Sequence, residues 1–489
     1  MSFPRKANVI LILVLFLSFV ACGEVKIPEN FKETHSAANI YPDYTDIAIP
    51  SNISPLNFLV KGHEEDDCLA ALHSGGTMIC VEGKGKVTFD IDVWHEFLAK
   101  AGNSEVVVRL YVKKDGEWLA YNPFKWFVKE EIDPFVCYRL IPPSYVCYEE
   151  LRLCQRDLTS FTSWDIYNNI DNAKGINQCI NCHSFQNYGT DRMQFHVRGK
   201  GGGTLVYDHG RISKVNLKRG DCISSGVYPS WHPKKNLIAY STNSTMQHFH
   251  AVGQQKVEVQ DSKSDLILYD VENDKVLNIS NKPFDLEVFP SWSPDGKWLY
   301  YSSATVADTA ASYTVEHYKE IRYNICRRSF NENTLTFGEE EVVLNAANDS
   351  LSAILPRVSP DGRYILYTAA PYGVFHIWHE EADLYLYDLS SKTHHSLSAA
   401  NSSRAESFHN WSSNGRWITF TSRRNDGNYT SLFFSYIDKN GKSSKAFQLP
   451  QENPEHDILS TVGYNVPEFT KEKIKTQVKD FRNALSSEQ

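Results

Sequence analysis

The chain has 489 residues, which suggests two to four domains at roughly 100–200 residues each. Its composition of 42% hydrophobic, 13% aromatic and 22% charged residues excludes a disordered or collagen-like protein, and the aromatic enrichment favours β-structure. The formal net charge of -9 lacks the basic surplus that is typical of nucleic-acid-binding proteins, so no nucleic-acid partner is expected.

The first 21 residues have the pattern of an export signal. Two basic residues precede an apolar stretch over residues 8–20, and Ala21 then stands directly before Cys22. A small residue followed by cysteine resembles a bacterial lipobox, whose cysteine is acylated after cleavage. We therefore predict a signal peptide over 1–21 and a lipid on Cys22 that anchors the protein to a membrane of the cell envelope, facing the periplasm or the cell surface. An ordinary secretory signal and an uncleaved anchor are the alternatives.

The next part of the chain is predicted to be a tether and a β-domain. Residues 23–45 are polar and are predicted to be the tether, while residues 46–160 alternate extended stretches with turns. The clearest feature is a hairpin over 106–121, and the whole segment predicts a β-sandwich-like domain. Disulfides persist outside the cytosol, and Cys68 and Cys80 are close enough in sequence to close a small loop.

A chemical motif lies in the segment 161–200. Cys179, Cys182 and His183 form C-x-x-C-H, which is the signature of c-type haem attachment. The two thiols can add to the haem vinyl groups from a compact turn, and the adjacent imidazole can bind the iron. We therefore predict one covalent haem c here. A disulfide or redox dithiol and a metal site are the alternatives, although a zinc site needs two further ligands that no second motif supplies.

The second axial ligand of the iron stays open at this point. Residues 191–198 are predicted to form a strand, on which Met193 and His196 project from opposite faces. Either side chain could complete the iron site, or the site could stay open. Arg198 stands near His196 and is the predicted partner of a haem propionate.

The carboxy-terminal half contains a repeat. Each copy has a large apolar residue, Pro or His, a variable residue and then Trp or Val, followed by a turn of the Pro-Asp-Gly kind and a strand of large residues. The copies recur about every 50–65 residues, a period typical of propeller blades, and begin at Tyr228, Phe289, Leu355 and Phe408. Further strands complete a four-stranded unit in each copy.

The Trp-Ser-Pro-Asp-Gly unit resembles the repeat of TolB-type β-propellers over roughly residues 195–465. The resemblance implies six blades. The four copies and an earlier hairpin within 203–215 account for five, so one blade is degenerate or is built from both ends of the chain, with 463–467 as its closing strand. We therefore predict a mostly β protein with a propeller over 201–468 and a carboxy-terminal helix within 469–489.

The whole arrangement resembles exported bacterial propeller lipoproteins that carry one C-x-x-C-H between an amino-terminal β-domain and TolB-like blades. The resemblance implies a haem but no redox partner. The predicted function is a lipid-anchored c-type cytochrome that transfers electrons or senses a redox ligand. The alternatives are a non-redox scaffold that binds an envelope protein or glycan, and a haem peroxidase. The sequence contains no G-x-S-x-G nucleophile elbow, which argues against a serine hydrolase.

Overall fold

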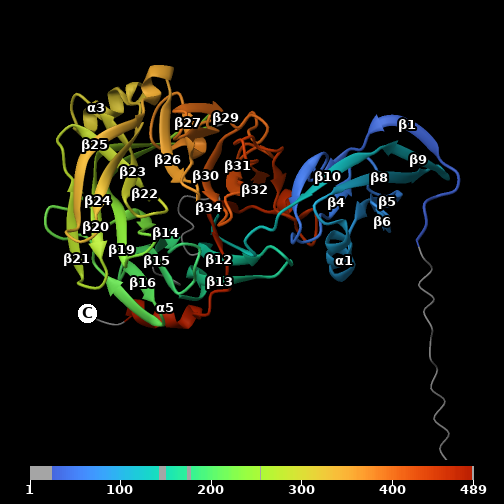
Figure 1. The fold of residues 1–489 in the computed structure, drawn as a ribbon, viewed down its shortest axis with the longest axis horizontal. Helices are drawn as coiled ribbons and strands as arrows, with labels where there is room; N and C mark the ends of the chain where they lie inside the picture. The colour runs from blue at the N-terminus through green and yellow to red at the C-terminus, as the bar shows by residue number, and fades with distance from the viewer. Residues whose placement is uncertain (1–24, 143–149, 173–177, 254, 487–489) are drawn as a thin grey trace, which may run out of the picture.

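The computed structural model describes residues 25–142, 150–172, 178–253 and 255–486. The chain is mostly β-structure and forms two lobes in Figure 1, an amino-terminal lobe drawn in blue and a larger lobe that holds the remaining sheets. The predicted signal peptide and Cys22 lie outside the described residues. Within the described ranges, no helix is long and apolar enough to cross a membrane.

The amino-terminal lobe holds a seven-stranded sheet and a three-stranded sheet. The larger sheet has the order β1-β9-β8-β10-β3, and β5 pairs with both β8 and β6, whereas the smaller sheet has the order β2-β4-β7. The elements are β1 (Lys32–Ala37), β2 (Ile40–Tyr41), β3 (Ile47–Pro50), β4 (Phe58–Val60), β5 (Asp67–Ser74), β6 (Thr77–Lys84), β7 (Lys86–Val87), α1 (Ile91–Ala101), β8 (Glu105–Lys114), β9 (Glu117–Asn122) and β10 (Phe124–Lys129).

The segment 23–45 differs from the predicted tether because part of it belongs to this lobe. β1 runs parallel to β9, with Lys32 opposite Leu119. Tyr44 is fully buried, and its carbonyl accepts a hydrogen bond from the indole of Trp126 at 2.7 Å. The segment is polar because β1 is an edge strand whose side chains are largely exposed, and backbone pairing does not require apolar residues.

Cys68 and Cys80 do not form the loop that their spacing suggested. They lie on paired strands, but Cys68 is opposite Gly83 and Cys80 is opposite Ala71. Three positions along a strand correspond to about 10 Å, which exceeds the Cα separation that a disulfide can bridge. Both are free thiols.

Among the described residues, the larger lobe contains six antiparallel units of four strands each. The first unit has the order β13-β12-β11-β34 and joins β11 (Phe135–Ile141), β12 (Arg152–Asp157) and β13 (Ser163–Asn168) to β34 (Gly463–Thr470). The second and third units follow as β14 (Cys179–Phe185), β15 (Arg192–Arg198), β16 (Gly203–Asp208), β17 (Arg211–Val215), β18 (Val227–Trp231), β19 (Leu237–Phe249), β20 (Val257–Asp270) and β21 (Lys275–Ser280).

The remaining units continue in chain order. They comprise β22 (Asp285–Trp292), β23 (Trp298–Thr305), β24 (Asn324–Asn331), β25 (Thr336–Leu344), β26 (Ser352–Val358), β27 (Tyr364–Ala370), β28 (Asp383–Asp388), β29 (Thr393–Ser396), β30 (Glu406–Trp411), β31 (Trp417–Ser422), β32 (Ser431–Tyr436) and β33 (Phe447–Gln448). The third and fourth units share one sheet through a single parallel pair, Ser264 with Leu286. Short helices occupy the connections and the tail: α2 (Asn169–Asn172), α3 (Ala311–Glu316), α4 (His456–Leu459) and α5 (Val478–Ser486).

The first unit differs from the predicted domain limits. Residues 135–157 were assigned to the amino-terminal domain, but β11 pairs with β34 over its whole length, from Phe135 opposite Thr470 to Ile141 opposite Gly463. The pairing joins segments more than 300 residues apart, so no local sequence pattern predicts it. The carboxy-terminal helix begins only at Val478, and its Phe481 packs on Phe195 with ring centroids 5.0 Å apart.

A β-bulge recurs in the innermost strand of every unit. The bulge residue is not glycine but has φ between 46° and 58°, a backbone conformation that such residues seldom adopt. Each bulge is followed by Pro or His. The six bulge residues are Cys182, Tyr228, Phe289, Leu355, Phe408 and Val466.

Tryptophans connect neighbouring units. Trp231 donates its indole N–H to the Ser184 carbonyl at 3.2 Å, and Trp292 donates in the same way to the Ser230 carbonyl at 3.1 Å. In each case the acceptor belongs to the preceding unit. The repeated tryptophan of the sequence therefore joins units as well as filling the core, and each such bond contributes on the order of 1 kcal/mol.

We expect Phe469→Ala to lower the free energy of unfolding by about 3–5 kcal/mol, the usual cost of removing a buried phenyl ring. Phe469 lies on β34, is fully buried, and packs near Phe434 with ring centroids 6.1 Å apart. The control is Phe284→Ala, because Phe284 is 47% exposed and its loss should change stability by less than about 0.5 kcal/mol. Urea denaturation of both variants tests whether β34 is required for the larger lobe, and equal effects would contradict this.

Candidate functional site

The C-x-x-C-H motif lies on a strand and not on the compact turn that its spacing suggested. Cys179, Cys182 and His183 all belong to β14, and the bulge falls between Asn181 and Ser184. Both cysteines are free and partly exposed. Cys182-His183-Ser184-Phe185 therefore occupies the same place in its unit as Tyr228-Pro-Ser-Trp231 does in the next. The motif is a member of the repeat, which the sequence analysis did not recognise.

Arg139 of β11 lies beside the two thiols. Its Nη1 donates to the Ile180 carbonyl at 2.7 Å and also to the Asn181 side-chain oxygen. Asn181 in turn donates to the Cys179 sulfur at 3.0 Å. Burial lowers the pKa of Arg139, whereas charge on Cys179 or Cys182 would raise it. Arg139 could not be predicted as a neighbour of the motif because it lies 40 positions before Cys179 in the sequence.

His183 has one ring nitrogen without a partner. The side chain is only 4% exposed, and its Nε2 is buried with no hydrogen bond to any described residue. Burial and the nearby Arg139 charge lower the pKa of His183 to about 3, while a hydrogen bond to the Val466 backbone acts in the opposite direction. At neutral pH the ring is therefore an uncharged imidazole with a free nitrogen.

His409 provides an internal comparison for His183, because it follows the bulge of its own unit in the same way. Its Nδ1 contacts the Thr368 hydroxyl at 3.1 Å, and its Nε2 contacts the Leu355 carbonyl at 2.8 Å. Burial lowers the pKa of His409 to about 3 as well. The two histidines share a position and a charge state, but only His183 leaves a nitrogen unused.

The two predicted second ligands, Met193 and His196, lie on β15 in surroundings of their own. Met193 is fully buried in an apolar cluster with Phe185 and Phe195. His196 lies opposite Asn181 on the paired strand, its Nδ1 contacts the Thr204 hydroxyl at 2.9 Å, and burial lowers its pKa to about 4. Neither side chain lines the cavity that His183 lines.

Arg198 and His196 line a second cavity of about 550 Å³, together with a glycine-rich loop and Lys214. Arg198 lies opposite Cys179 on the paired strand. The residues predicted to surround the haem thus lie in two places. His196 and Arg198 are cross-strand neighbours of the segment that holds the two cysteines, whereas His183 lines a different cavity.

His183 lines a cavity of about 400 Å³ to which the innermost strands of all six units contribute. The second residue after each bulge faces it, and these six residues are Ser184, Ser230, Ser291, Arg357, Asn410 and Glu468. We call this the channel cavity. Four members of the ring are small and uncharged, so Arg357 and Glu468 determine its charge.

Glu468 holds its proton unusually strongly. Burial raises the pKa of its carboxyl group to about 8, although the Phe185 N–H, which donates to Oε1 at 3.0 Å, and the Arg357 charge both lower it. At neutral pH Glu468 is therefore largely the uncharged acid. Within the described ranges, no three His, Cys, Asp or Glu side chains come together as a metal site.

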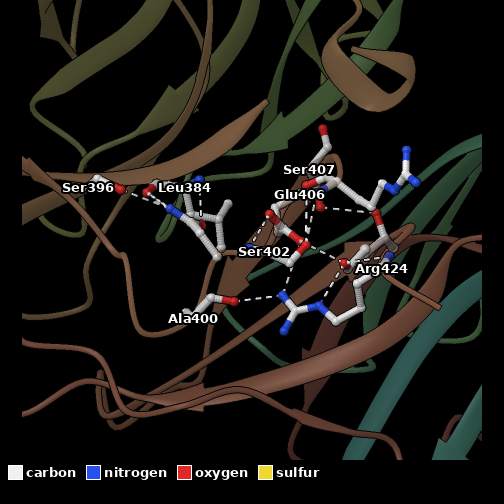
Figure 2. Close-up of polar contacts among 11 residues, drawn as sticks. Leu384, Ser396, Ala400, Ser402, Glu406, Ser407 and Arg424 are labelled. Carbon is white, nitrogen blue, oxygen red and sulfur yellow. Dashed lines mark hydrogen bonds and ion pairs between the residues drawn. The ribbon is translucent and has the colours of Figure 1, made fainter. Parts of the chain in front are cut away.

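A second buried carboxylate, Glu406, has a different character (Figure 2). It accepts hydrogen bonds from the hydroxyls of Ser402 and Ser422 at 2.6 and 2.7 Å and pairs with Arg424 at 3.0 Å. Because these donors surround the carboxylate, it is a structural anchor at the start of β30 and leaves little room for a ligand.

No protein-family model and no curated protein matches the chain. Its fold is similar to that of several solved structures at low identity. The tricorn protease matches with 13% identity and a TM-score of 0.35 over 72% of this chain, and this chain spans only 33% of the protease. Prolyl oligopeptidase B from Galerina marginata matches with 11% identity and a TM-score of 0.36, covering 72% of this chain and 44% of that one. Hydrazine synthase from Kuenenia stuttgartiensis matches with 11% identity and a TM-score of 0.33, covering 55% and 65%.

We expect Glu468→Gln to weaken the loss of stability that accompanies rising pH. The folded-state pKa is raised, so between about pH 4.5 and 8 the folded protein holds a proton that the unfolded chain releases, and stability falls as the pH rises through this window. Melting temperatures at pH 5 and pH 8 should therefore differ less in the variant than in the wild type. Glu472→Gln, at an exposed position, serves as the control. An unchanged pH dependence in Glu468→Gln would show that the carboxyl group ionises normally.

Proposed function

We propose that this protein is an exported c-type cytochrome with one covalent haem, held to the cell envelope by a lipid on Cys22. In this proposal Cys179 and Cys182 carry the haem and His183 binds the iron. Such a haem would supply one-electron exchange at its iron. The redox partner stays unassigned.

The unpaired nitrogen of His183 is the observation that carries the proposal. A histidine that binds iron must be a neutral imidazole with one free nitrogen. Its other nitrogen usually bonds a backbone carbonyl or a carboxylate that fixes the ring. His183 meets these requirements through its low pKa, its bare Nε2 and its contact with the Val466 backbone. His409 follows an equivalent bulge, but both of its ring nitrogens have hydrogen-bond partners. The position after the bulge therefore does not by itself leave a nitrogen unpaired.

The chemistry of the two thiols also suits the covalent attachment of a haem. Cys179 and Cys182 are free and partly exposed, whereas Cys137 and Cys154, which lie on the paired strands β11 and β12, are deeply buried. Thioether formation requires thiols that are reduced and accessible. Two such thiols and one adjacent imidazole therefore fit a covalently bound haem in their chemistry, but neither thiol lines the cavity that His183 lines.

We propose that His183 would be the one protein ligand of the iron, so that a bound haem would have a position open to a small ligand. Met193 lies in the apolar core and His196 lines another cavity, so neither shares a cavity with His183 in the present arrangement. An open position favours sensing of a small ligand, and it keeps the haem peroxidase as the second candidate function. Peroxide turnover by the matured protein separates these two.

We also propose that the six units of the larger lobe are the blades of a closed six-bladed propeller of the TolB type. This is supported by the contribution of all six innermost strands to one cavity and by the pairing of β34 with β11, which joins the last strand of the lobe to the first unit. In this proposal the amino-terminal sheets form the separate sandwich-like domain. Its buried core extends to Trp417 and Phe434 of the last unit.

Replacement of both thiols tests the haem. Protein produced with the c-type maturation machinery should show a pyridine haemochrome spectrum and the added mass of one haem, and the variant Cys179→Ser/Cys182→Ser should lose both. A wild-type protein that carries no covalent haem after proper maturation would contradict the proposal and would leave the non-redox scaffold as the alternative.

The histidines supply a matched pair of variants. His183→Gln should retain the covalent haem, because the thioether bonds remain, but its Soret band should shift because the iron loses its protein ligand. His409→Gln removes an equivalent buried imidazole and should leave the Soret band unchanged. Similar spectra for the two variants would show that His183 is not the ligand.

The lipid anchor is tested separately. Cys22→Ser should move the protein from the membrane fraction to the soluble fraction of the cell envelope, because covalent lipid is the proposed source of membrane attachment. Metabolic labelling with a radioactive or clickable fatty acid should mark the wild type only. A Cys22→Ser protein that still sediments with membranes and still incorporates label would contradict acylation at this site.

A further inference from the structure

Arg357 places an unpaired guanidinium group in the channel cavity. It is the second residue after the Leu355 bulge of β26, so its side chain faces the cavity. Its Nε is buried without a hydrogen-bond partner, and the described residues offer its guanidinium group neither a hydrogen bond nor an ion pair within 4 Å. Most other arginines enclosed by the lobe have such partners; Arg423, for example, donates to the Ile377 carbonyl at 2.7 Å.

The charge on Arg357 cannot be removed by deprotonation. Burial lowers the pKa of Arg357, but a guanidinium group remains charged in proteins. An enclosed charge is unfavourable unless a counter-charge or hydrogen bonds compensate it. Glu468, the acidic residue that lines the same cavity, has its pKa raised to about 8 by burial and already accepts the Phe185 N–H at Oε1. The cavity therefore has an excess of positive charge, to which Lys471 adds.

The rest of the lining indicates what this charge could hold. The ring contributes three serine hydroxyls and the Asn410 amide as neutral hydrogen-bonding groups, and Trp231 and Trp292 add apolar surface to the lining. The planar fork of a guanidinium group matches a carboxylate in two parallel hydrogen bonds. Arg357 is the one cation of the six-residue ring, and its planar fork among neutral donors suits a singly charged carboxylate group.

We propose that the channel cavity is a binding site for a carboxylate group, which forms an ion pair with Arg357. The carboxylate belongs either to a free small organic acid or, if the proposed function is correct, to a propionate of the bound haem. Only the second source rests on the proposed function.

The first experiment uses the full chain with Cys179→Ser/Cys182→Ser, which cannot carry covalent haem, and measures succinate binding by isothermal titration calorimetry at pH 7. Succinate should bind, the uncharged analogue succinamide should not, and Arg357→Gln should weaken binding by about tenfold or more. Arg363→Gln is the matched control, because Arg363 is 46% exposed, pairs with Asp388 at 3.1 Å and lies outside the cavity. Arg357→Lys keeps the positive charge and should retain part of the affinity for succinate. Binding by this variant would show that the loss in Arg357→Gln comes from the missing charge and not from misfolding.

The second experiment distinguishes the two sources in matured, haem-containing protein. If a propionate occupies the site, succinate should no longer bind and Arg357→Gln should lower the midpoint potential of the haem, because a positive charge near the porphyrin favours the reduced state. If a free acid occupies the site, succinate should still bind and the potential should not change. Absence of Arg357-dependent succinate binding in the first experiment, together with an unchanged potential in the second, would overturn the inference. Failure of haem attachment would contradict only the proposed function, because the first experiment does not require haem.

Discussion

The larger lobe depends on a backbone distortion that recurs six times. In each innermost strand one non-glycine residue adopts positive φ, and this costs on the order of 1–3 kcal/mol wherever it occurs. The distortion is tolerated because the flanking residues are held in register by the neighbouring strand. It also points the side chains of the bulge residue and of the residues after it in directions that differ from those of a regular strand. Tyr228 and Phe289 consequently meet with ring centroids 4.4 Å apart, and the ring of polar side chains faces a common cavity.

This repeated geometry explains why equivalent positions carry different chemistry. Proline is frequent after the bulge because its fixed φ and missing N–H suit the end of the distortion. His183 and His409 replace it in two units, and the outcome then depends on their neighbours. Thr368 and Leu355 satisfy His409, whereas nothing among the described residues satisfies Nε2 of His183. The same position therefore has both ring nitrogens in contact with a partner in one unit and one nitrogen without a partner in another.

Much of the architecture could be predicted from the sequence, because strands, turns and tryptophans recur at a regular spacing. The turn after Trp292 is an example: Ser293 bonds Asp295 at 2.6 Å and Gly296 supplies φ of 78°, as Pro-Asp-Gly implies. The three residues of the C-x-x-C-H motif all lie on one strand, β14. What could not be predicted depends on contacts between distant parts of the chain. Arg139 contacts the cysteine segment from another unit, and Arg357 lines the same cavity as His183 although the two lie in different units. The side chains of β1 are polar and largely exposed, so its composition does not indicate that it pairs in a sheet.

The pairing of β34 with β11 has a consequence for the order of events during folding. Val466 and Glu468 contact His183 and Phe185 respectively, so the surroundings of the motif are completed by residues that leave the ribosome almost 300 positions later. Until that strand arrives, the two thiols and the imidazole belong to an open chain that a modifying enzyme can reach. A group bound to His183 or Arg357 would then be linked thermodynamically to the state in which β34 is paired. Because β34 supplies Val466, Pro467 and Glu468 to the cavity, occupancy of the cavity would be coupled to the pairing of β34 with β11.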